Sequence, residues 1–342
     1  MSENKGYQIL GMLLRKKIPL LNAHILHLMF TMAGTIDSGR DANGVQNIPA
    51  FRDILCDLEL WHEAPAELEK LLLEHLLELV SDPQKNIGNI RLMREFALVE
   101  KLLNILKKSD CRNSNTTLLL EIMRGLLCTN PRVSDVLCFA LFTTATLSFP
   151  TVEKKMKINE GFIAEQSQEN VQSNKVILRN QCLKLFFSLL HTGDDDIHIN
   201  YCEDVVQVVG FDWILLFLHA DLHRSTVIWG MRILMTLLSL PTLMQKFRSG
   251  ICNGHWLIKS ENVLHNKMME ALGSDAPQNS KVSRKHTIRS EIFKVPGFQH
   301  LNWLLVEHIE VPEVLLSYMI QTTRKNLIVE IFINFMVERN KK

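Results

Sequence analysis

The sequence predicts an all-α protein, arranged as an armadillo- or HEAT-like α-solenoid with two long polar loops. Apolar residues recur at helical spacing through most of the 342 residues, and the alternating runs typical of strands are scarce. A pattern also repeats, in which a phenylalanine is followed by apolar residues at the third, sixth and seventh positions. It begins at Phe96, Phe211 and Phe298. Self-similarity of this kind favours stacked helical repeats.

Four segments carry the helical pattern most clearly. In PAELEKLLLEHLLELV (65–80) the leucines share one broad face, Pro65 suits a first helical turn, and Pro83 predicts a stop just before it. The same reasoning predicts helices in NTTLLLEIMRGLLC (115–128), NKVILRNQCLKLFFSLLH (174–191) and TVIWGMRILMTLLSL (226–240). These segments are apolar around more than a narrow stripe, so we expect neighbouring helices to cover each on two sides.

Composition divides the chain into blocks. Two segments, 148–174 and 271–291, are polar and lack helical periodicity, so we expect mobile loops there. The other predicted blocks are a first helical block (1–147), a second helical block (175–270), the last helices (292–320) and a C-terminal tail (321–342).

The stretch GYQILGMLLRKKIPLLNAHILHLMF (6–30) is apolar but is cut by Arg15, Lys16 and Lys17. A membrane span needs about 20 apolar residues in a row, and a signal peptide needs a small-residue cleavage site. We therefore expect neither, and we read the stretch as the first helices of a fold. The seven cysteines form no CxxC pair and most lie beside apolar residues, which favours reduced thiols and a cytoplasmic protein.

The composition and motifs give little support for chemistry. The formal net charge of +1 argues against nucleic acid as a partner, because phosphate contacts need a basic surplus. His219 and His223 have the i, i+4 spacing of a shared metal site, but Ala220 replaces the glutamate of an HExxH motif. We interpret the two histidines as polar residues at a turn between helices.

Two further groups of polar residues are candidates for a metal site. The acidic segment GDDDIHINYCED (193–204) lacks the spacing of an EF-hand loop, so we interpret it as a loop after a helix. His24 and His27 lie within an apolar helical segment and are read as core or partly exposed residues. The sequence therefore predicts no enzyme, and no catalytic, metal-binding or cofactor-binding residues.

The segment KVSRKHTIR (281–289) is the most basic part of the chain. Its basic residues, with no acid between them, are Lys281, Arg284, Lys285 and Arg289. EKKMK (153–157) and Arg15–Lys17 are weaker basic patches. A solvated loop is one interpretation, and contact with an acidic partner or with anionic lipid is the other.

Long phrases of the sequence resemble a known family. They are the 6–30 stretch, FRDILCDLELW (51–61), RLMREFALVEKLL (91–103) and VPGFQHLNWLL (295–305). These resemble, in order, the armadillo-like region of the BEACH family, in the branch that carries C-terminal WD repeats and a FYVE domain. The resemblance extends from about Gly6 to Val314. Residues 321–342 depart from it, which suggests a short isoform or a fragment with its own C-terminus.

The resemblance implies a function. It implies a non-enzymatic scaffold segment that holds other proteins in selective autophagy or endosomal vesicle trafficking, in the cytoplasm or peripherally on those membranes. It assigns no catalytic residues and no cofactor to this chain. The alternative is a peripheral membrane-binding module that acts through the basic loops on anionic lipid.

Overall fold

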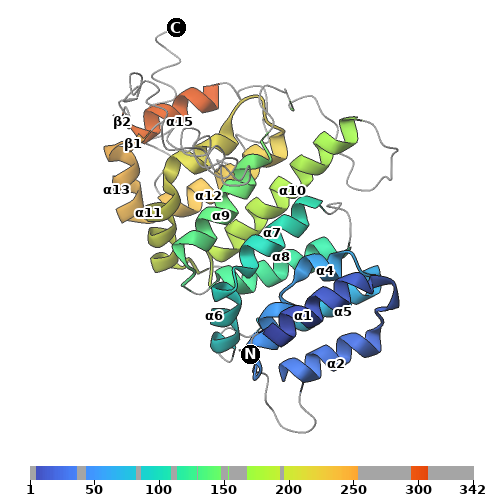
Figure 1. Cartoon of the computed structure of the whole chain (residues 1–342). Coiled ribbons are helices and arrows are strands. Elements are labelled where there is room, and N and C mark those ends of the chain that lie inside the picture. Colours follow the sequence, from blue (N-terminus) through green and yellow to red (C-terminus); the bar gives the residue numbers. More distant parts are fainter. Residues whose placement is uncertain are drawn as a thin grey trace, which may run out of the picture. The chain divides into compact units, whose positions relative to one another are not determined.

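A computed structural model describes residues 5–36, 44–81, 86–108, 114–128, 130–147, 153, 168–192, 196–252 and 294–306. The chain forms two compact units. Figure 1 shows its helices coloured along the sequence. The first unit comprises residues 1–147 and 158–194, and the second comprises residues 148–157 and 195–342.

The described part of the first unit is helical. Its α-helices are α1 (Lys5–Lys16), α2 (Ala23–Ala33), α3 (Ile48–Ala50), α4 (Leu58–His62), α5 (Ala66–Glu78), α6 (Ile87–Glu95), α7 (Leu98–Lys108), α8 (Ser114–Leu127), α9 (Val133–Ala145) and α10 (Gln168–Leu189). A 3₁₀ turn, η1 (Ile18–Leu20), follows α1, and a π-helical turn, η2 (Phe51–Leu55), follows α3.

Local chemistry sets the ends of these helices. The Asn22 side chain accepts a hydrogen bond from the Ile25 N–H and so caps the start of α2. Gly34 ends the same helix at φ 68°, in the left-handed region that glycine adopts without strain. Pro65 precedes α5, which ends at Glu78, close to the limits predicted from the sequence.

The core of the first unit lies between α5, α7 and α8, with α4, α9 and α10 packed against them. Close approach between elements depends on a glycine: a Cβ added to Gly125 of α8 would lie 2.8 Å from Cγ2 of Val80. The largest buried side chains include Trp61 and Phe51, which are fully enclosed. Burial of large aromatic and aliphatic side chains is the main stabilising contribution to such a core.

The second unit is built around α11 (Ile199–Leu215) and α12 (Arg224–Leu238). The 3₁₀ turn η3 (Leu216–Leu218) joins them. The unit continues into α13 (Pro241–Ser249), β1 (Ile251–Cys252), β2 (Lys294–Val295) and α15 (Gly297–Val306). The two short strands pair antiparallel, with Ile251 opposite Val295. Helix α11 breaks at Gly210, whose φ of 74° and ψ of 171° suit glycine alone, so Phe211 begins a new helical segment.

Two of the repeated phenylalanines, Phe96 and Phe211, stand at such a break, and the third, Phe298, lies in the first turn of α15 after β2. Phe96 follows α6, and Ala97, at φ 53°, separates it from α7. In the second unit the rings of Phe211 and Phe298 both pack edge-on against Phe247, with centroids 4.9 and 5.1 Å away. The pattern found in the sequence therefore marks the first turn of a helical segment or a position just before it, after a helix at Phe96 and Phe211 and after β2 at Phe298.

These observations confirm the all-α prediction for the described residues, with two two-residue strands as the exception. The armadillo- or HEAT-like stacking stays a prediction. Helix α10 begins at Gln168, inside the segment 148–174 that was predicted as a loop, and belongs to the first unit. The predicted loop 271–291 and the tail 321–342 lie outside the described residues.

Within the described part of the chain, no single helix is long and apolar enough to cross a membrane. Helices α12 and α13 pass that test together by length and composition, but they meet at a bend of 108°.

Candidate functional site

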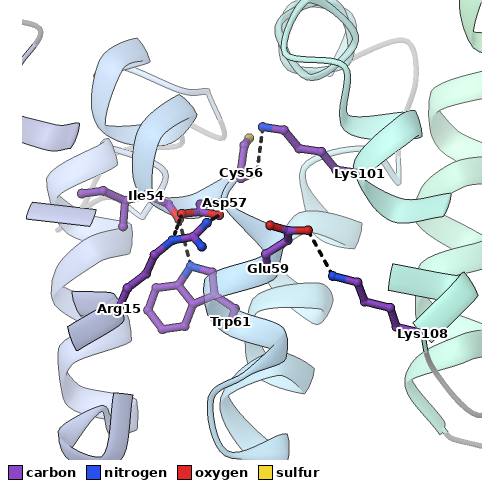
Figure 2. Close-up of polar contacts among 8 residues, drawn as sticks. All are labelled: Arg15, Ile54, Cys56, Asp57, Glu59, Trp61, Lys101 and Lys108. Atoms are coloured by element: carbon purple, nitrogen blue, oxygen red, sulfur yellow. Dashed lines mark hydrogen bonds and ion pairs between the residues drawn. The ribbon is translucent and has the colours of Figure 1, made fainter. Parts of the chain in front are cut away.

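A group of polar contacts surrounds residues 54–61, which lead from η2 into α4 (Figure 2). We call this region the 54–61 junction. On one side Arg15, near the end of α1, binds Asp57 through two hydrogen bonds: Nη2 lies 2.6 Å from Oδ1, and Nε lies 3.1 Å from Oδ2. This fork-to-carboxylate geometry is the strong form of an ion pair. The hydrogen bond to Asp57 raises the pKa of the Arg15 guanidinium.

Helix α7 contacts the junction through two lysines. Lys101 Nζ donates a hydrogen bond of 3.0 Å to the Cys56 carbonyl oxygen, and Lys108 Nζ lies 3.1 Å from Glu59 Oε1. Figure 2 shows both lysines extending from the same helix toward residues 56–59. The Lys108 hydrogen bond lowers the pKa of the Glu59 carboxyl, so the pair is charged on both sides.

The inner side of the junction is apolar. The Trp61 indole N–H donates to the Ile54 carbonyl oxygen at 2.9 Å, which satisfies a buried acceptor at the end of η2. Cys56 is fully buried, and this burial raises the pKa of its thiol to about 12. A thiol with that pKa stays protonated at neutral pH and is a poor nucleophile.

The junction therefore holds helices together. Its charged groups, Arg15 with Asp57 and Lys108 with Glu59, neutralise each other, and Lys101 satisfies a backbone carbonyl. Ion pairs and capped carbonyls of this kind connect α1, α4 and α7.

A second polar group lies deeper in the first unit. The carboxylate of Glu69, in a residue that is only 8% exposed, lies 2.7 Å from His62 Nδ1 and accepts a hydrogen bond from Asn115 Nδ2 at 2.8 Å. A void beside it, lined mainly by Leu72, Ile105 and other apolar side chains, leaves ≈ 10 Å³ for the centre of a water molecule. Ligand pockets are typically about 300–1,000 Å³, so this void holds at most one water.

His75 is the most strongly perturbed histidine of the described residues. It lies on α5, stacks on Phe30 at 4.0 Å, and its Nε2 is 2.8 Å from Thr35 Oγ1. Because the Thr35 hydroxyl donates to the Phe30 carbonyl oxygen, it accepts from His75, and Nε2 carries the proton. Burial is the main cause that lowers the pKa of His75 to about 4.

The sequence candidates for a metal site are separated by the fold. His219 follows η3, His223 precedes α12, and residues 219–223 form the turn between them, so no helical face carries both rings. His223 Nδ1 caps α12 by accepting from the Ser225 N–H at 3.3 Å. Among the described residues, no group of three histidine, cysteine, aspartate or glutamate side chains is placed to hold a metal ion.

The other candidates have local roles. In the acidic segment, His198 caps α11 by accepting from the Tyr201 N–H, Cys202 is buried, and Glu203 Oε1 accepts from the Thr242 hydroxyl at 2.7 Å. Asp194 and Asp195 lie outside the described residues. His24 and His27 are exposed on α2, more so than the core or partly exposed positions expected from the sequence.

The basic candidates have two outcomes. Lys281, Arg284, Lys285 and Arg289 lie outside the described residues. In the basic patch Arg15–Lys17, Arg15 forms an ion pair with Asp57, and Lys16 and Lys17 are exposed.

Sequence reasoning missed the 54–61 junction. Its contacts with α1 and α7 join residues 42 to 49 positions apart, such as Arg15 with Asp57 and Lys108 with Glu59. A helical pattern predicts which face is apolar, but it does not tell which lysine reaches which carboxylate. The one available signal was the spacing of Lys101 and Lys108, which places both on one face of a helix.

The described residues are almost entirely helical, and the polar contacts described above connect helices. Comparison with known proteins identifies relatives of similar sequence. The chain is 30% identical over 322 residues to the human WD repeat- and FYVE domain-containing protein 4, and 32% identical over 322 residues to the mouse protein of the same name. Each alignment covers 93% of this chain and 10% of the relative.

A weaker similarity, 25% identity over 207 residues, links the chain to BEACH domain-containing protein A2 of Arabidopsis thaliana, covering 59% of this chain and 5% of that protein. No protein-family model and no solved structure matches. The comparisons confirm the resemblance to the WD-repeat and FYVE-domain branch of the BEACH family. The chain spans about a tenth of the length of the two WD repeat- and FYVE domain-containing relatives.

Proposed function

We propose that this chain is a non-enzymatic scaffold segment of a BEACH-type protein, holding other proteins during selective autophagy or endosomal vesicle trafficking. The observation that carries the proposal is the similarity to WD repeat- and FYVE domain-containing protein 4 along 93% of the chain. Because the aligned part of those proteins is only a tenth of their length, the role proposed here is that of one segment.

The contacts of the first unit support a holding role. The charged side chains of the 54–61 junction are paired between helices, and the Cys56 thiol is buried. Charged groups paired in this way stabilise the packing of one helix on another. A general acid or base would instead have to lie within reach of a substrate proton. Helical arrays typically bind partners along extended faces, and we expect the partner surface on exposed helix faces and in the basic segment 281–289.

Affinity capture from cytosol tests the proposal, with residues 1–342 as bait beside a 1–320 form that lacks the tail. Circular dichroism first establishes that both baits are helical. We expect both to recover autophagy or endosomal proteins in amounts well above those recovered by an unrelated folded helical protein. Folded bait that recovers none of these proteins contradicts the scaffold role.

Two variants sharpen this experiment. Substituting glutamine for the four basic residues of segment 281–289 tests that segment. The matched control removes the same number of charges from described, exposed positions: Lys107, Lys184, Lys246 and Arg248. Loss of partners with the first variant alone assigns the contact to the segment. A hydrolase or transferase activity that disappears on replacing His219 contradicts the non-enzymatic part of the proposal.

A further inference from the structure

Helix α1 is fixed in one orientation by contacts along one face. The inward-facing residues are Tyr7, Gly11, Leu14 and Arg15. Asn47 Nδ2 donates to Tyr7 Oη at 2.7 Å, and the backbone of Gly11 passes so close to Asp53 that an added Cβ would lie 3.1 Å from its carbonyl oxygen. Residues spaced by three or four share a helical face, so these contacts determine which side of α1 faces outward.

The opposite face is apolar in the middle and basic at both ends. Ile9, Met12 and Leu13 are 51%, 56% and 53% exposed. Their i, i+3, i+4 spacing makes one continuous patch, and the same line continues to an exposed lysine at each end of the helix. We call this set the α1 stripe: Lys5, Ile9, Met12, Leu13 and Lys16.

Exposed apolar and basic residues continue beyond the end of α1. Leu20 of η1 is 66% exposed, Lys17 is exposed, and α1 contains no acidic residue. Scattered exposed apolar side chains are ordinary on a protein surface, but a contiguous apolar patch with a charged rim marks an interaction site. The charge of its rim determines which partner fits.

The arrangement matches the interface of an anionic bilayer. An amphipathic helix lies in the plane of the interface when its apolar side chains enter the headgroup–acyl boundary and lysines at its edge reach the lipid phosphates. The α1 stripe has both features, and its lysines complement negative lipid. An exposed face of one helix is convex, whereas recognition of a partner helix usually depends on a groove.

We propose that the α1 stripe is a membrane-contact surface for anionic lipid. Ile9, Met12 and Leu13 enter the headgroup–acyl boundary, and Lys5 and Lys16 bind lipid headgroups. Arg15 stays in its ion pair with Asp57 and holds the helix in place, so it contributes no lipid contact. This inference does not depend on the scaffold role, since it derives from the exposure and charge of α1 alone.

Co-sedimentation of residues 1–342 with vesicles tests the surface, using phosphatidylcholine with or without phosphatidylserine. We expect the chain to sediment with the anionic vesicles and much less with the neutral ones. Ile9→Ser with Leu13→Ser should lower the partition coefficient roughly twentyfold, because each residue loses about half of its full apolar transfer. Lys5→Gln with Lys16→Gln should lower it roughly thirtyfold, at about 1 kcal/mol per lysine.

The matched control is Ile87→Ser with Val133→Ser, which removes two apolar side chains, 68% and 57% exposed, from the first turns of α6 and α9. It should bind vesicles as the wild type does. Circular dichroism and thermal melting establish that each variant is folded, as expected for substitutions at exposed positions. Salt gives a second readout, because apolar insertion persists at ionic strengths that abolish purely electrostatic binding.

Three results would overturn the proposal. The first is a wild-type chain that does not sediment with anionic vesicles. The second is binding that survives both α1 stripe variants but disappears when the basic residues of segment 281–289 become glutamine, since the loop is then the lipid contact. The third is a wild-type chain that self-associates in solution through the stripe, shown by a lower sedimentation mass of the Ile9→Ser, Leu13→Ser variant, without stripe-dependent vesicle binding.

Discussion

Arg15 and Asp57 form a two-pronged ion pair that ties the end of α1 to the residue before α4, with contacts of 2.6 and 3.1 Å. The side chains are 42% and 22% exposed, so water screens part of the attraction. We expect Asp57→Asn to lower the free energy of unfolding by about 1 kcal/mol, the range of well-aligned pairs near a surface. Denaturant unfolding followed by circular dichroism measures the change.

A double-mutant cycle with Arg15→Gln isolates the pair itself. The matched control is Arg91 with Glu95, an i, i+4 pair with 82% and 50% of the side chains exposed, for which we expect a coupling of only about 0.3 kcal/mol. A coupling at Arg15 no larger than this control would mean that the two hydrogen bonds do not anchor α1.

Gly297 is required by its contact with Phe247. A Cβ at this position would lie 2.6 Å from the Phe247 carbonyl oxygen and 2.7 Å from two ring carbons. The carbonyl oxygen belongs to the backbone of α13, and the Phe247 ring packs between the rings of Phe211 and Phe298. The two groups therefore cannot both move away from an added Cβ. We therefore expect Gly297→Ala to destabilise the second unit by about 1–3 kcal/mol, the usual cost of overpacking. Thermal or denaturant unfolding checks this.

Gly88→Ala is the matched control for that substitution. Gly88 also lies in the first turn of a helix, α6, and an added Cβ would meet nothing within 4 Å. Here alanine should stabilise by about 0.5–1 kcal/mol, because it loses less backbone entropy on folding than glycine does. If both substitutions stabilise, the packing of α15 on Phe247 is looser than described.

The sequence predicted helices well because their signal is local. The helix expected at 65–80 spans Ala66–Glu78, and the one expected at 115–128 spans Ser114–Leu127. The apolar period of both helices is a local signal, and at 65–80 a proline near each end and acidic residues in the first turn add to it. The start of α10 at Gln168 was missed because its first turns are polar and lack the apolar period.

Long-range relationships could not be predicted in the same way. The sequence shows a glycine before two of the repeated phenylalanines, but not that Gly210 is needed for a positive φ and Gly297 for close approach. Likewise, the i, i+4 spacing of His219 and His223 has meaning only within one continuous helix. The helix ends before the first of them, so the two rings do not share one helical face.

Three cysteines should be unreactive in the folded chain. Cys56, Cys182 and Cys202 are buried, and burial raises the pKa of each thiol to about 12. The thiolate is the reactive form, so alkylation at neutral pH should be slower than for an ordinary thiol by orders of magnitude. Timed iodoacetamide labelling followed by peptide mass spectrometry measures each site.

Cys128 and Cys138 provide the internal comparison, since both are partly exposed. They should label well before the buried three. In denaturant all five should label at similar rates, which separates burial from local sequence effects. Rapid labelling of Cys56 in folded protein would mean that the 54–61 junction opens on the timescale of the reaction.

His75 should make stability depend on pH. Its folded pKa is about 4, against an ordinary value of 6.5, because burial disfavours the charged ring. Above pH 6.5 the ring is neutral in the folded and unfolded states, and its contribution is fully present. As pH falls from 6.5 towards 4, the unfolded chain binds a proton that the folded chain does not. Stability should then fall by up to about 1.4 kcal/mol per pH unit, roughly 3 kcal/mol in all.

Glu78 does not reverse this expectation. Its carboxylate lies 3.8 Å from His75 Nδ1 but its side chain is 81% exposed, so water screens the attraction that would favour a charged ring. His75→Gln keeps a donor for the Thr35 hydroxyl and removes the titration. The difference in unfolding free energy between pH 7 and pH 5 should therefore be smaller in His75→Gln than in the wild type. The control, His24→Gln at an exposed position of α2, should show the same difference as the wild type. Equal pH dependence in the wild type and His75→Gln would mean that His75 takes up its proton without unfolding α5, and that the α2–α5 contact is open to water.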